Sequence, residues 1–473
     1  MKYNSKNVHY SIIGLQRFLS SLERSKRFKL RKLRYHKYES TRENEYNLKG
    51  LKYSPQYYSP YSFEKKRHHK PHYPVNIKYL LTVPELFSKT IETGNLKIVD
   101  GSLLIPKCFS LIDQYEESFD FLKRLFIILH SEKSSKITLD YSECERIDVD
   151  ASICMDIILA EFIHHFKKCN QQGFHDNLIR EIFPVNYEKD NIKKVLYSIG
   201  SYRNLKGISI KFPDIEALPA LINDNNKTDV WERSEIDQTK IVEYVKNCLR
   251  RLGRELSTDT ETSFYKVIGE VMSNAEEHST MPNRFAIGFF QETHNDGEHF
   301  GIFNFSIFNF GDTIYQTFKK KDCLNKKVIQ QMSNLSDNFT KKRWFSRSQF
   351  EEETLWTLYA LQEGVTSKDT KRGNGSIQYI ENFFKLKGDS LKDSISKLVV
   401  MSGNTRIEFD GTYKIIEKQR EEGRRKFKMV TFNESGDIND MPDKNFVKFS
   451  SNFFPGTMIA ARILVKSDNT NAK

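Results

Sequence analysis

Glu270-Val-Met-Ser-Asn274-Ala-Glu-Glu-His278 is the stretch of sequence that decides the predicted fold. Residues four apart on an α-helix project from the same face, so Glu270, Asn274 and His278 form one polar row. The same predicted helix carries an apolar row on its opposite side, made of Phe264, Val267, Ile268, Val271 and Ala275. Taken alone, this pattern fits either a solvent-facing helix side or a row of functional groups.

The three side chains of the polar row suit nucleotide chemistry for separate reasons. Glu270 can orient or deprotonate a water that attacks a γ-phosphate. The amide oxygen of Asn274 is a hard ligand of the kind that Mg²⁺ accepts, and His278 can donate to phosphate oxygens. We therefore interpret Glu270 as a candidate general base, Asn274 as a candidate metal ligand and His278 as a candidate phosphate contact.

Two predicted strands carry a polar residue and a glycine at one end. The stretch Phe305-Ser-Ile-Phe-Asn309-Phe-Gly311 places a side-chain acceptor at the end of a sheet, and the glycine lets the backbone approach a ligand closely. Phe454-Pro-Gly456-Thr457 leads into a final strand that is predicted to end at Val465. Both strand ends are candidate ligand contacts.

A glycine-rich basic loop opens directly onto another predicted helix. It reads Thr370-Lys371-Arg372-Gly373-Asn-Gly375-Ser-Ile. The backbone N–H groups of such a loop and the dipole of the helix that follows make an anion site, to which Lys371 and Arg372 add charge.

In this order and spacing, the four segments resemble the N box, G1 box, G2 box and closing Gly-Thr strand of the GHKL ATPases, the class of gyrase, heat-shock chaperones, histidine kinases and MutL. The resemblance covers about residues 238–465. It implies a Bergerat-type α/β sandwich that binds ATP and Mg²⁺. Residue by residue it implies Glu270 as general base and Asn274 as Mg²⁺ ligand, and it implies nucleotide contacts at Asn309, Gly311, Gly373, Gly375 and Thr457.

The chain departs from the family's pattern at the G1 box and in the lid. The usual Asp-x-Gly-x-Gly is here Asn309-Phe-Gly311-Asp312-Thr313, so an amide replaces the carboxylate and the second glycine is lost. Asn309 can still accept from an adenine amino group. About 60 residues separate the G1 and G2 segments and include Lys341–Arg347 and Leu355–Ser367. In the family this region is the ATP lid, and its length suggests a lid that reports nucleotide state to a partner.

The preceding region, residues 76–222, alternates strand and helix patterns and predicts an α/β domain. We expect strands at Leu96–Val99, Ser102–Ile105 and Lys136–Ser142, a helix over Leu111–His130, and a buried helix that begins near Asp148 or Asp150. This strand, loop and buried helix resemble the STAS domain of anti-sigma-factor antagonists. Val149 stands where that family has its phosphorylated Ser, which implies a packing or docking module without a phospho-switch.

The N-terminal segment, residues 1–75, carries the basic character of the chain. It holds 18 Lys plus Arg against five Glu and no Asp, whereas the whole chain has a net charge of +12. A basic run, Arg24 to Lys37, is interleaved with aromatic residues and could grip phosphates and stack bases. A solvated tail, or an arm docked on an acidic face of the same protein, explains the composition equally well.

Further features bound the class of protein. No stretch is apolar for the 18 to 20 or so residues that cross a bilayer, and the N-terminus lacks a signal-peptide pattern, so we expect a cytoplasmic protein. The six cysteines are scattered, which predicts reduced and mostly buried thiols. We expect no metal site among His68, His69 and His72, in an extended tract, or at the pair His164-His165, whose members point to different helix faces.

The predicted fold is α/β (α+β): a basic arm (1–75), a STAS-like α/β domain (76–222), a linker (223–237), a GHKL Bergerat-type sandwich (238–465) and a polar tail (466–473). The expected ligands are ATP and Mg²⁺. The expected partners are a protein bound through the STAS-like domain, nucleic acid bound through the arm, and a second copy in a homodimer, with no membrane. Three functions stay open: a slow ATPase switch, a nucleotide-sensing scaffold without turnover, and an anti-sigma-like serine kinase. The layout resembles bacterial or phage-defence regulators.

Overall fold

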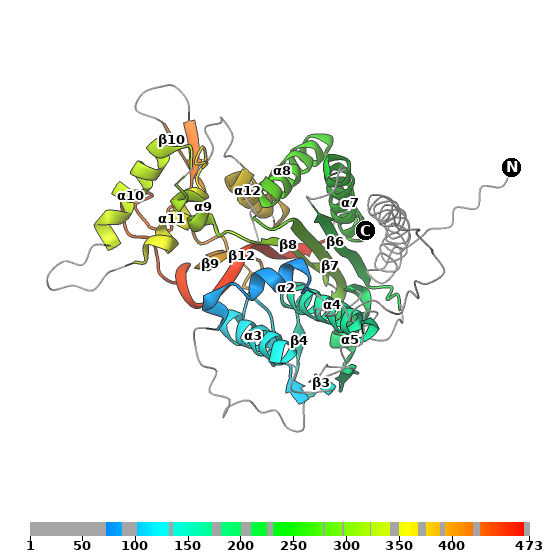
Figure 1. The fold of residues 1–473 in the computed structure, drawn as a ribbon. Coiled ribbons are helices and arrows are strands. Elements are labelled where there is room, and N and C mark those ends of the chain that lie inside the picture. The colour runs from blue at the N-terminus through cyan, green and yellow to red at the C-terminus, as the bar shows by residue number, and fades with distance from the viewer. Residues whose placement is uncertain are drawn as a thin grey trace, which may run out of the picture. The chain divides into compact units, whose positions relative to one another are not determined.

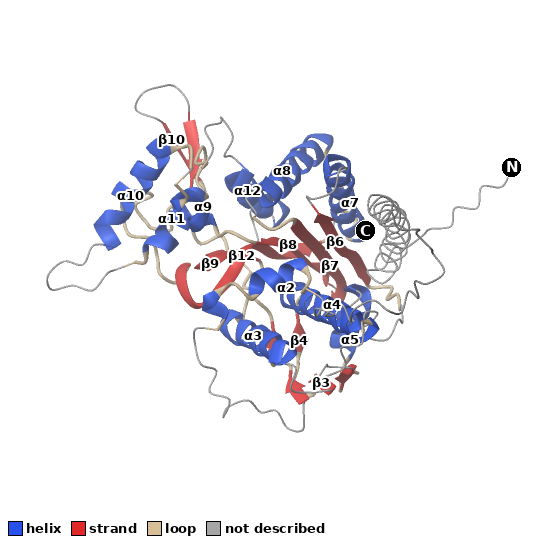
Figure 2. Cartoon of the chain, viewed as in Figure 1, coloured by secondary structure: helices blue, strands red, loops and turns tan. Residues whose placement is uncertain are grey.

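The computed structural model of the chain (Figures 1 and 2) describes residues 72–87, 102–131, 136–172, 181–199, 210–224, 230–277, 280–295, 298–321, 323–340, 350–367, 375–387, 393–419 and 426–467. The chain divides into two compact units. One comprises His72–Lys167 with His175–Lys473, and the other comprises Met1–Pro71 with Lys168–Phe174. The predicted basic arm, apart from residues 72–75, and the strand Leu96–Val99 lie outside the described residues.

A five-stranded antiparallel sheet organises the C-terminal part of the described chain. Its spatial order is β6-β7-β8-β12-β9. The strands are β6 (Ile215–Asp224), β7 (Asn283–Asn295), β8 (Glu298–Phe310), β9 (Lys397–Phe409) and β12 (Val447–Lys466). The sequence also predicts strands over Arg284–Gln291 and Phe300–Phe310, and these are confirmed as β7 and β8. The predicted final strand ending near Val465 is confirmed as β12.

Three helices cover one face of this sheet: α7 (Val230–Arg251), α8 (Thr258–Glu277) and α12 (Gly375–Lys387) (Figure 1). Alternate residues of the strands, such as Phe303 and Phe305 of β8, pack with buried residues of α7 and α8 in one core. Ser257 and Thr260, at the start of α8, share a pocket with Lys385 and Leu386, at the end of α12. The two helices therefore run antiparallel, and the C-terminal end of α8 lies at the same end as the N-terminus of α12.

The N-terminal part contains a parallel three-stranded sheet, β1-β3-β5, formed by Ser102–Leu104, Lys136–Asp140 and Glu181–Val185. Three longer helices accompany this sheet: α3 (Tyr115–Ser131), α4 (Val149–Gln171) and α5 (Asp190–Ile199). The same part of the chain also contains the short helices α2 (Val75–Leu80) and η2 (Pro84–Leu86). Two short strands, β2 (Cys108–Phe109) and β4 (Arg146–Ile147), form a separate parallel pair. The predicted strands at 102–105 and 136–142, the helix at 111–130 and the helix start beside Asp148 are confirmed in place, with shorter strands.

The N-terminal part packs against the second face of the five-stranded sheet, within the same compact unit. Leu80, Leu122 and Ile158 line one apolar cavity with Phe310 and Phe454 of the sheet. Of the stretch 223–237, which the sequence predicts as a linker, residues 223–224 end β6 and residues 230–237 begin α7. The fold is mixed α/β, and the predicted domain boundaries remain predictions.

The predicted lid region folds in part as helices beside the sheet edge. It contains α9 (Ile314–Lys319), α10 (Lys326–Thr340) and α11 (Glu352–Ala360), and near it lies the hairpin β10 (Ile416–Gln419) and β11 (Lys426–Met429). Trp356 of α11 is buried, and its indole Nε1 donates to Ser336 Oγ of α10 at 3.1 Å. The described helices are therefore anchored, and Lys341–Arg347 lies outside the described residues.

Candidate functional site

A row of polar side chains crosses all five strands of the large sheet. In the spatial order of the strands, the cross-strand partners are Asn223, Arg284, Asn309, Thr457 and Ser402. All but Thr457, which is half-buried, are buried. Two residues further along each strand, on the same face, the partners are all apolar: Leu221, Ala286, Ile307, Ile459 and Val400. Along each strand, the helix-covered face of the sheet thus changes from apolar to polar side chains between one row and the next, two residues away.

On β6 and β7 the row is built around a buried ion-pair network. Arg284 has no exposed side-chain surface; its Nε donates to Glu276 of α8 at 2.8 Å and its Nη2 to Asp237 of α7 at 2.9 Å. Asn223 Nδ2 donates to the same Glu276 carboxylate at 2.8 Å. A buried guanidinium needs such partners, so Arg284 ties the start of α7 and the end of α8 to the sheet.

On β8, β12 and β9 the row carries no charged side chain, and one of its acceptor oxygens has no hydrogen-bond partner among the described residues. Asn309 Nδ2 donates to the Phe310 carbonyl at 3.2 Å, and its Oδ1 has no partner among the described residues. The hydroxyls of Thr457 and Ser402 lie 2.9 Å apart. Ser402 Oγ also accepts from the Ile314 N–H at 2.8 Å and donates to the Gly456 carbonyl at 3.1 Å. Asn309 and Thr457 therefore present neighbouring hydrogen-bonding groups held by a fixed support.

Two glycines bring the ends of β8 and β12 together. Gly456 has φ +152°, and a Cβ there would lie 2.0 Å from the Asn309 carbonyl oxygen. Gly311 has φ 125°, and its N–H donates to the Pro455 carbonyl at 3.1 Å. Only glycine fits so close an approach, and the register between Asn309 and Thr457 depends on it. The Gly311 carbonyl accepts from the Tyr79 hydroxyl of α2 at 2.7 Å; burial, with the nearby Asp312, raises the pKa of Tyr79 to about 12.

The predicted row on α8 lies at the margin of the buried stripe of that helix, not opposite to it. Glu270 and Asn274 are half-buried, and neither has a hydrogen-bond or ion-pair partner among the described residues. Gly269 and Glu276 face α7, where they meet Gln238 and Ser234. Because successive helical residues turn by about 100°, Glu270 and Asn274 point away from α7.

The end of α8 lies beside the turn at Gly311 and Asp312. The N–H of Asp312, next to Gly311, donates to Thr280 Oγ1 at 3.2 Å, three residues after α8 ends. Gly375 begins α12, at the same end of the helix layer. Asn309, Gly311 and Thr457 are therefore placed together, near the end of α8. His278, Lys371, Arg372 and Gly373 lie outside the described residues and stay predictions.

Sequence reasoning missed Asn223, Arg284 and Ser402 of the polar row. The signal was present as a break in strand alternation: Ser402 follows Leu398 and Val400 at a spacing of two, and Arg284 precedes Ala286 in the same phase. A polar residue in the buried phase of a strand marks either a structural network or a ligand site.

A second polar cluster surrounds the loop that resembles the STAS switch. Val149 itself is buried, and Arg462 of β12 binds both Asp113 and Asp148, while Arg146 also binds Asp113. Burial acts to raise the pKa of the Asp113 carboxyl, but Arg462 and Arg146 together hold it well below its usual range. Burial and the nearby Asp148 raise the pKa of Asp150 to about 7. The ion pairs of Arg462 with Asp113 and Asp148 thus hold this loop against β12 of the sheet.

Five of the six cysteines are buried and Cys108 is half-buried, which confirms the predicted burial of the thiols. Within the part of the chain that the structure describes, no helix is both long and apolar enough to span a membrane. No family model, curated protein or solved structure matches the chain.

Proposed function

We propose that this protein binds ATP with Mg²⁺ in a GHKL-type site at the polar end of the five-stranded sheet. The observation that carries the proposal is the polar row on the helix-covered face. In its neutral half the Oδ1 of Asn309, which has no partner among the described residues, lies beside the Thr457 hydroxyl. These are the positions that the resemblance assigns to adenine recognition.

Adenine recognition in this proposal uses the Asn309 and Thr457 side chains. Asn309 Oδ1 accepts from the exocyclic amino group of adenine, and the Thr457 hydroxyl, supported by Ser402, contacts the adjacent ring edge. An amide can present either oxygen or nitrogen, so we expect weaker discrimination between adenine and guanine than a carboxylate would give.

Metal and phosphate binding fall to the ends of α8 and α12. The amide oxygen of Asn274 accepts from none of the described residues and is the proposed Mg²⁺ ligand. The N-terminus of α12, which begins at Gly375, is suited to an anion. Lys371, Arg372, Gly373 and His278 are the proposed phosphate contacts. When bound, Mg²⁺ neutralises developing charge on the phosphates.

Hydrolysis in this proposal is slow and begins from Glu270, whose carboxylate has no partner within the described part of the chain and is available to orient a water. Closure of the predicted lid, which lies between the segments Phe305–Gly311 and Thr370–Gly375, changes the grip of the protein on a partner protein or nucleic acid. The N-terminal α/β part is then a STAS-like docking module in which the buried Val149 replaces a phosphoacceptor. A scaffold that binds ATP without turnover uses the same site.

Titration of a fluorescent ATP analogue, with and without Mg²⁺, tests the site. The wild type should bind more tightly with Mg²⁺, and Asn274→Ala should lose that dependence, a change of about tenfold or 1.4 kcal/mol. Asn334→Ala, an exposed position on α10, is the matched control and should behave as wild type. If Asn274→Ala retains the full Mg²⁺ effect, the proposed metal ligand is wrong.

Phosphate release separates the two uses of the site. Glu270→Ala should retain ATP binding and abolish turnover if the protein is an ATPase. Wild-type protein that binds ATP and releases no phosphate is the non-hydrolysing scaffold, and a turnover rate unchanged by Glu270→Ala would show that Glu270 is not the base.

A further inference from the structure

We propose that Glu292, His294 and His299 bind a divalent transition-metal ion such as Zn²⁺ at the far end of the β7–β8 hairpin. This site goes beyond the proposed ATP site and is independent of it. Arg284 and His294 are ten residues apart on β7, which at about 3.3 Å per residue separates the two ends by about 33 Å.

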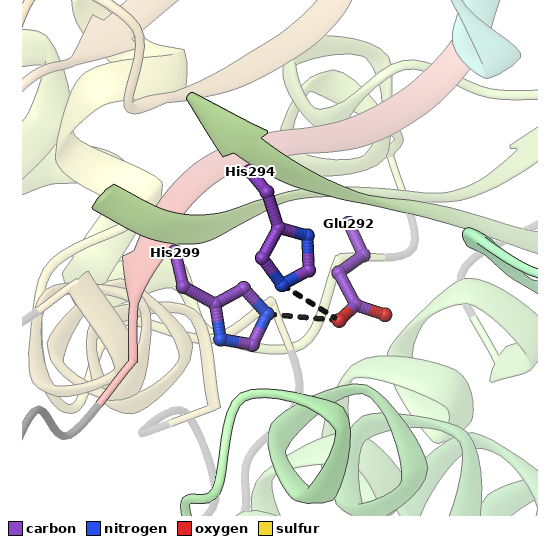
Figure 3. Close-up of side chains that lie close together, drawn as sticks. All are labelled: Glu292, His294 and His299. Carbon is purple, nitrogen blue, oxygen red and sulfur yellow. Dashed lines mark hydrogen bonds and ion pairs between the residues drawn. The ribbon is translucent and has the colours of Figure 1, made fainter. Parts of the chain in front are cut away.

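Strand geometry brings the three side chains to one face (Figure 3). Glu292 and His294 are two residues apart on β7, so they share a face, and His294 pairs directly with His299 of β8. The two imidazole rings stack with centroids 4.0 Å apart and planes 12° apart. Their Nε2 atoms both point to Glu292 Oε1, at 2.8 Å for His299 and 3.9 Å for His294.

The distances are close to those of a three-ligand metal site. One ligand atom from each residue can be chosen so that all three lie within 4.8 Å of one another. Zinc bonds of about 2.0–2.1 Å in tetrahedral geometry separate neighbouring ligand atoms by about 3.3 Å, so rotations of the side chains alone can accommodate the ion. Two imidazoles and a carboxylate are ligands that zinc accepts, and His294, with 69% of its side chain exposed, leaves an open side for water.

Arg251 of α7 orients the carboxylate for this role. Its Nε and Nη2 lie 3.1 and 3.0 Å from Glu292 Oε2, while Oε1 is turned to the histidines. A ligand carboxylate held through its second oxygen is the arrangement in which surrounding groups fix metal ligands in proteins. Arg251 also lies 3.8 Å from Glu216 of β6, so it is itself held in place.

The same three residues could instead form only a protonated histidine–glutamate pair, and metal titration distinguishes the two. Full-length protein freed of metal with a chelator is titrated with Zn²⁺ against a chromophoric chelator, and separately with Co²⁺ while visible absorption is recorded. The variants are His294→Ala, which removes an exposed ligand and should leave the fold intact, and His72→Ala, an exposed matched control.

We expect the wild type and His72→Ala to bind one equivalent of Zn²⁺ that His294→Ala binds at least tenfold more weakly, and Co²⁺ to give visible bands that His294→Ala lacks. Circular dichroism confirms that each variant is folded. The proposal is overturned if the wild type binds no more Zn²⁺ than His294→Ala, because only the ion pair would then remain.

Discussion

The polar row on the five-stranded sheet differs between its two halves. On β6 and β7 the buried Arg284 is bound by the carboxylates of Glu276 and Asp237, and Asn223 completes the network. On β8 and β12 the row holds no charge, and the Oδ1 of Asn309 has no partner among the described residues. Buried polar groups normally satisfy one another. In the first half the two carboxylates bind the Nε and Nη2 of Arg284 and leave its Nη1 without a partner among the described residues, whereas the second half leaves an acceptor oxygen open beside a hydroxyl. The difference teaches that burial of polar residues does not by itself mark function; an available acceptor does.

Removing the hub of the charged half should have the largest effect. Arg284→Ala leaves Glu276 and Asp237 facing each other in the core without their cation, and we expect a loss of about 3–5 kcal/mol in the free energy of unfolding. Urea denaturation followed by circular dichroism measures it. A variant within 1 kcal/mol or so of wild type would show that this half of the row is not structural.

A side chain added at Gly456, where the two strand ends are in close contact, should have the second-largest effect on stability. In Gly456→Ala the new Cβ would meet the Asn309 carbonyl oxygen at 2.0 Å, in a backbone conformation that is strained for any other residue. We expect a loss of about 2–3 kcal/mol in stability and weaker ATP binding, because β12 must move away from Asn309. Gly253→Ala is a useful control: its φ is also positive, at +69°, but a Cβ there meets nothing within 4 Å. Equal losses in the two variants would mean that backbone strain, and not the contact with Asn309, is responsible.

Removing the Ser402 hydroxyl, which holds Thr457 in the neutral half of the row, should lower the free energy of unfolding by less than the first two changes. Ser402→Ala removes a buried hydroxyl that accepts from the Ile314 N–H and lies beside the half-buried Thr457 hydroxyl. We expect the free energy of unfolding to fall by about 1–2 kcal/mol, with a several-fold loss of ATP affinity. Thermal denaturation and nucleotide titration on the same preparation give both numbers. An ATP affinity that is unchanged despite the lost stability would remove Thr457 from the site.

Much of the fold could be predicted because it follows from local patterns. Short, mostly apolar runs located β7 and β8, and the helical spacing of Phe264, Val267 and Val271 located α8. The pairing of Asn309 with Arg284 on one side and Thr457 on the other could not be predicted, since it depends on strand register over long sequence separations. The same holds for His294 and His299, which become cross-strand neighbours only once the hairpin register is fixed.

The predicted separation of the chain into a linker and two domains illustrates a second limit. A polar stretch such as Asn223–Lys227 has a loop composition, yet Asn223 lies in β6 with its side chain buried against Glu276. Composition reports the average solvent exposure of a residue type. It does not indicate that a buried amide, such as that of Asn223, donates a hydrogen bond to a buried carboxylate.

Nucleotide selectivity at Asn309 tests the central claim most directly. ATP and GTP, each with Mg²⁺, are titrated into wild type, Asn309→Ala and Asn309→Asp, with stability measured alongside. We expect Asn309→Ala to lose about tenfold in ATP affinity while its stability changes by less than about 1 kcal/mol. Asn309→Asp should bind ATP and disfavour GTP, because a carboxylate accepts from the adenine amino group and repels the guanine carbonyl oxygen. If all three proteins bind both nucleotides alike, or none binds either, Asn309 does not recognise a base and the proposed site is wrong.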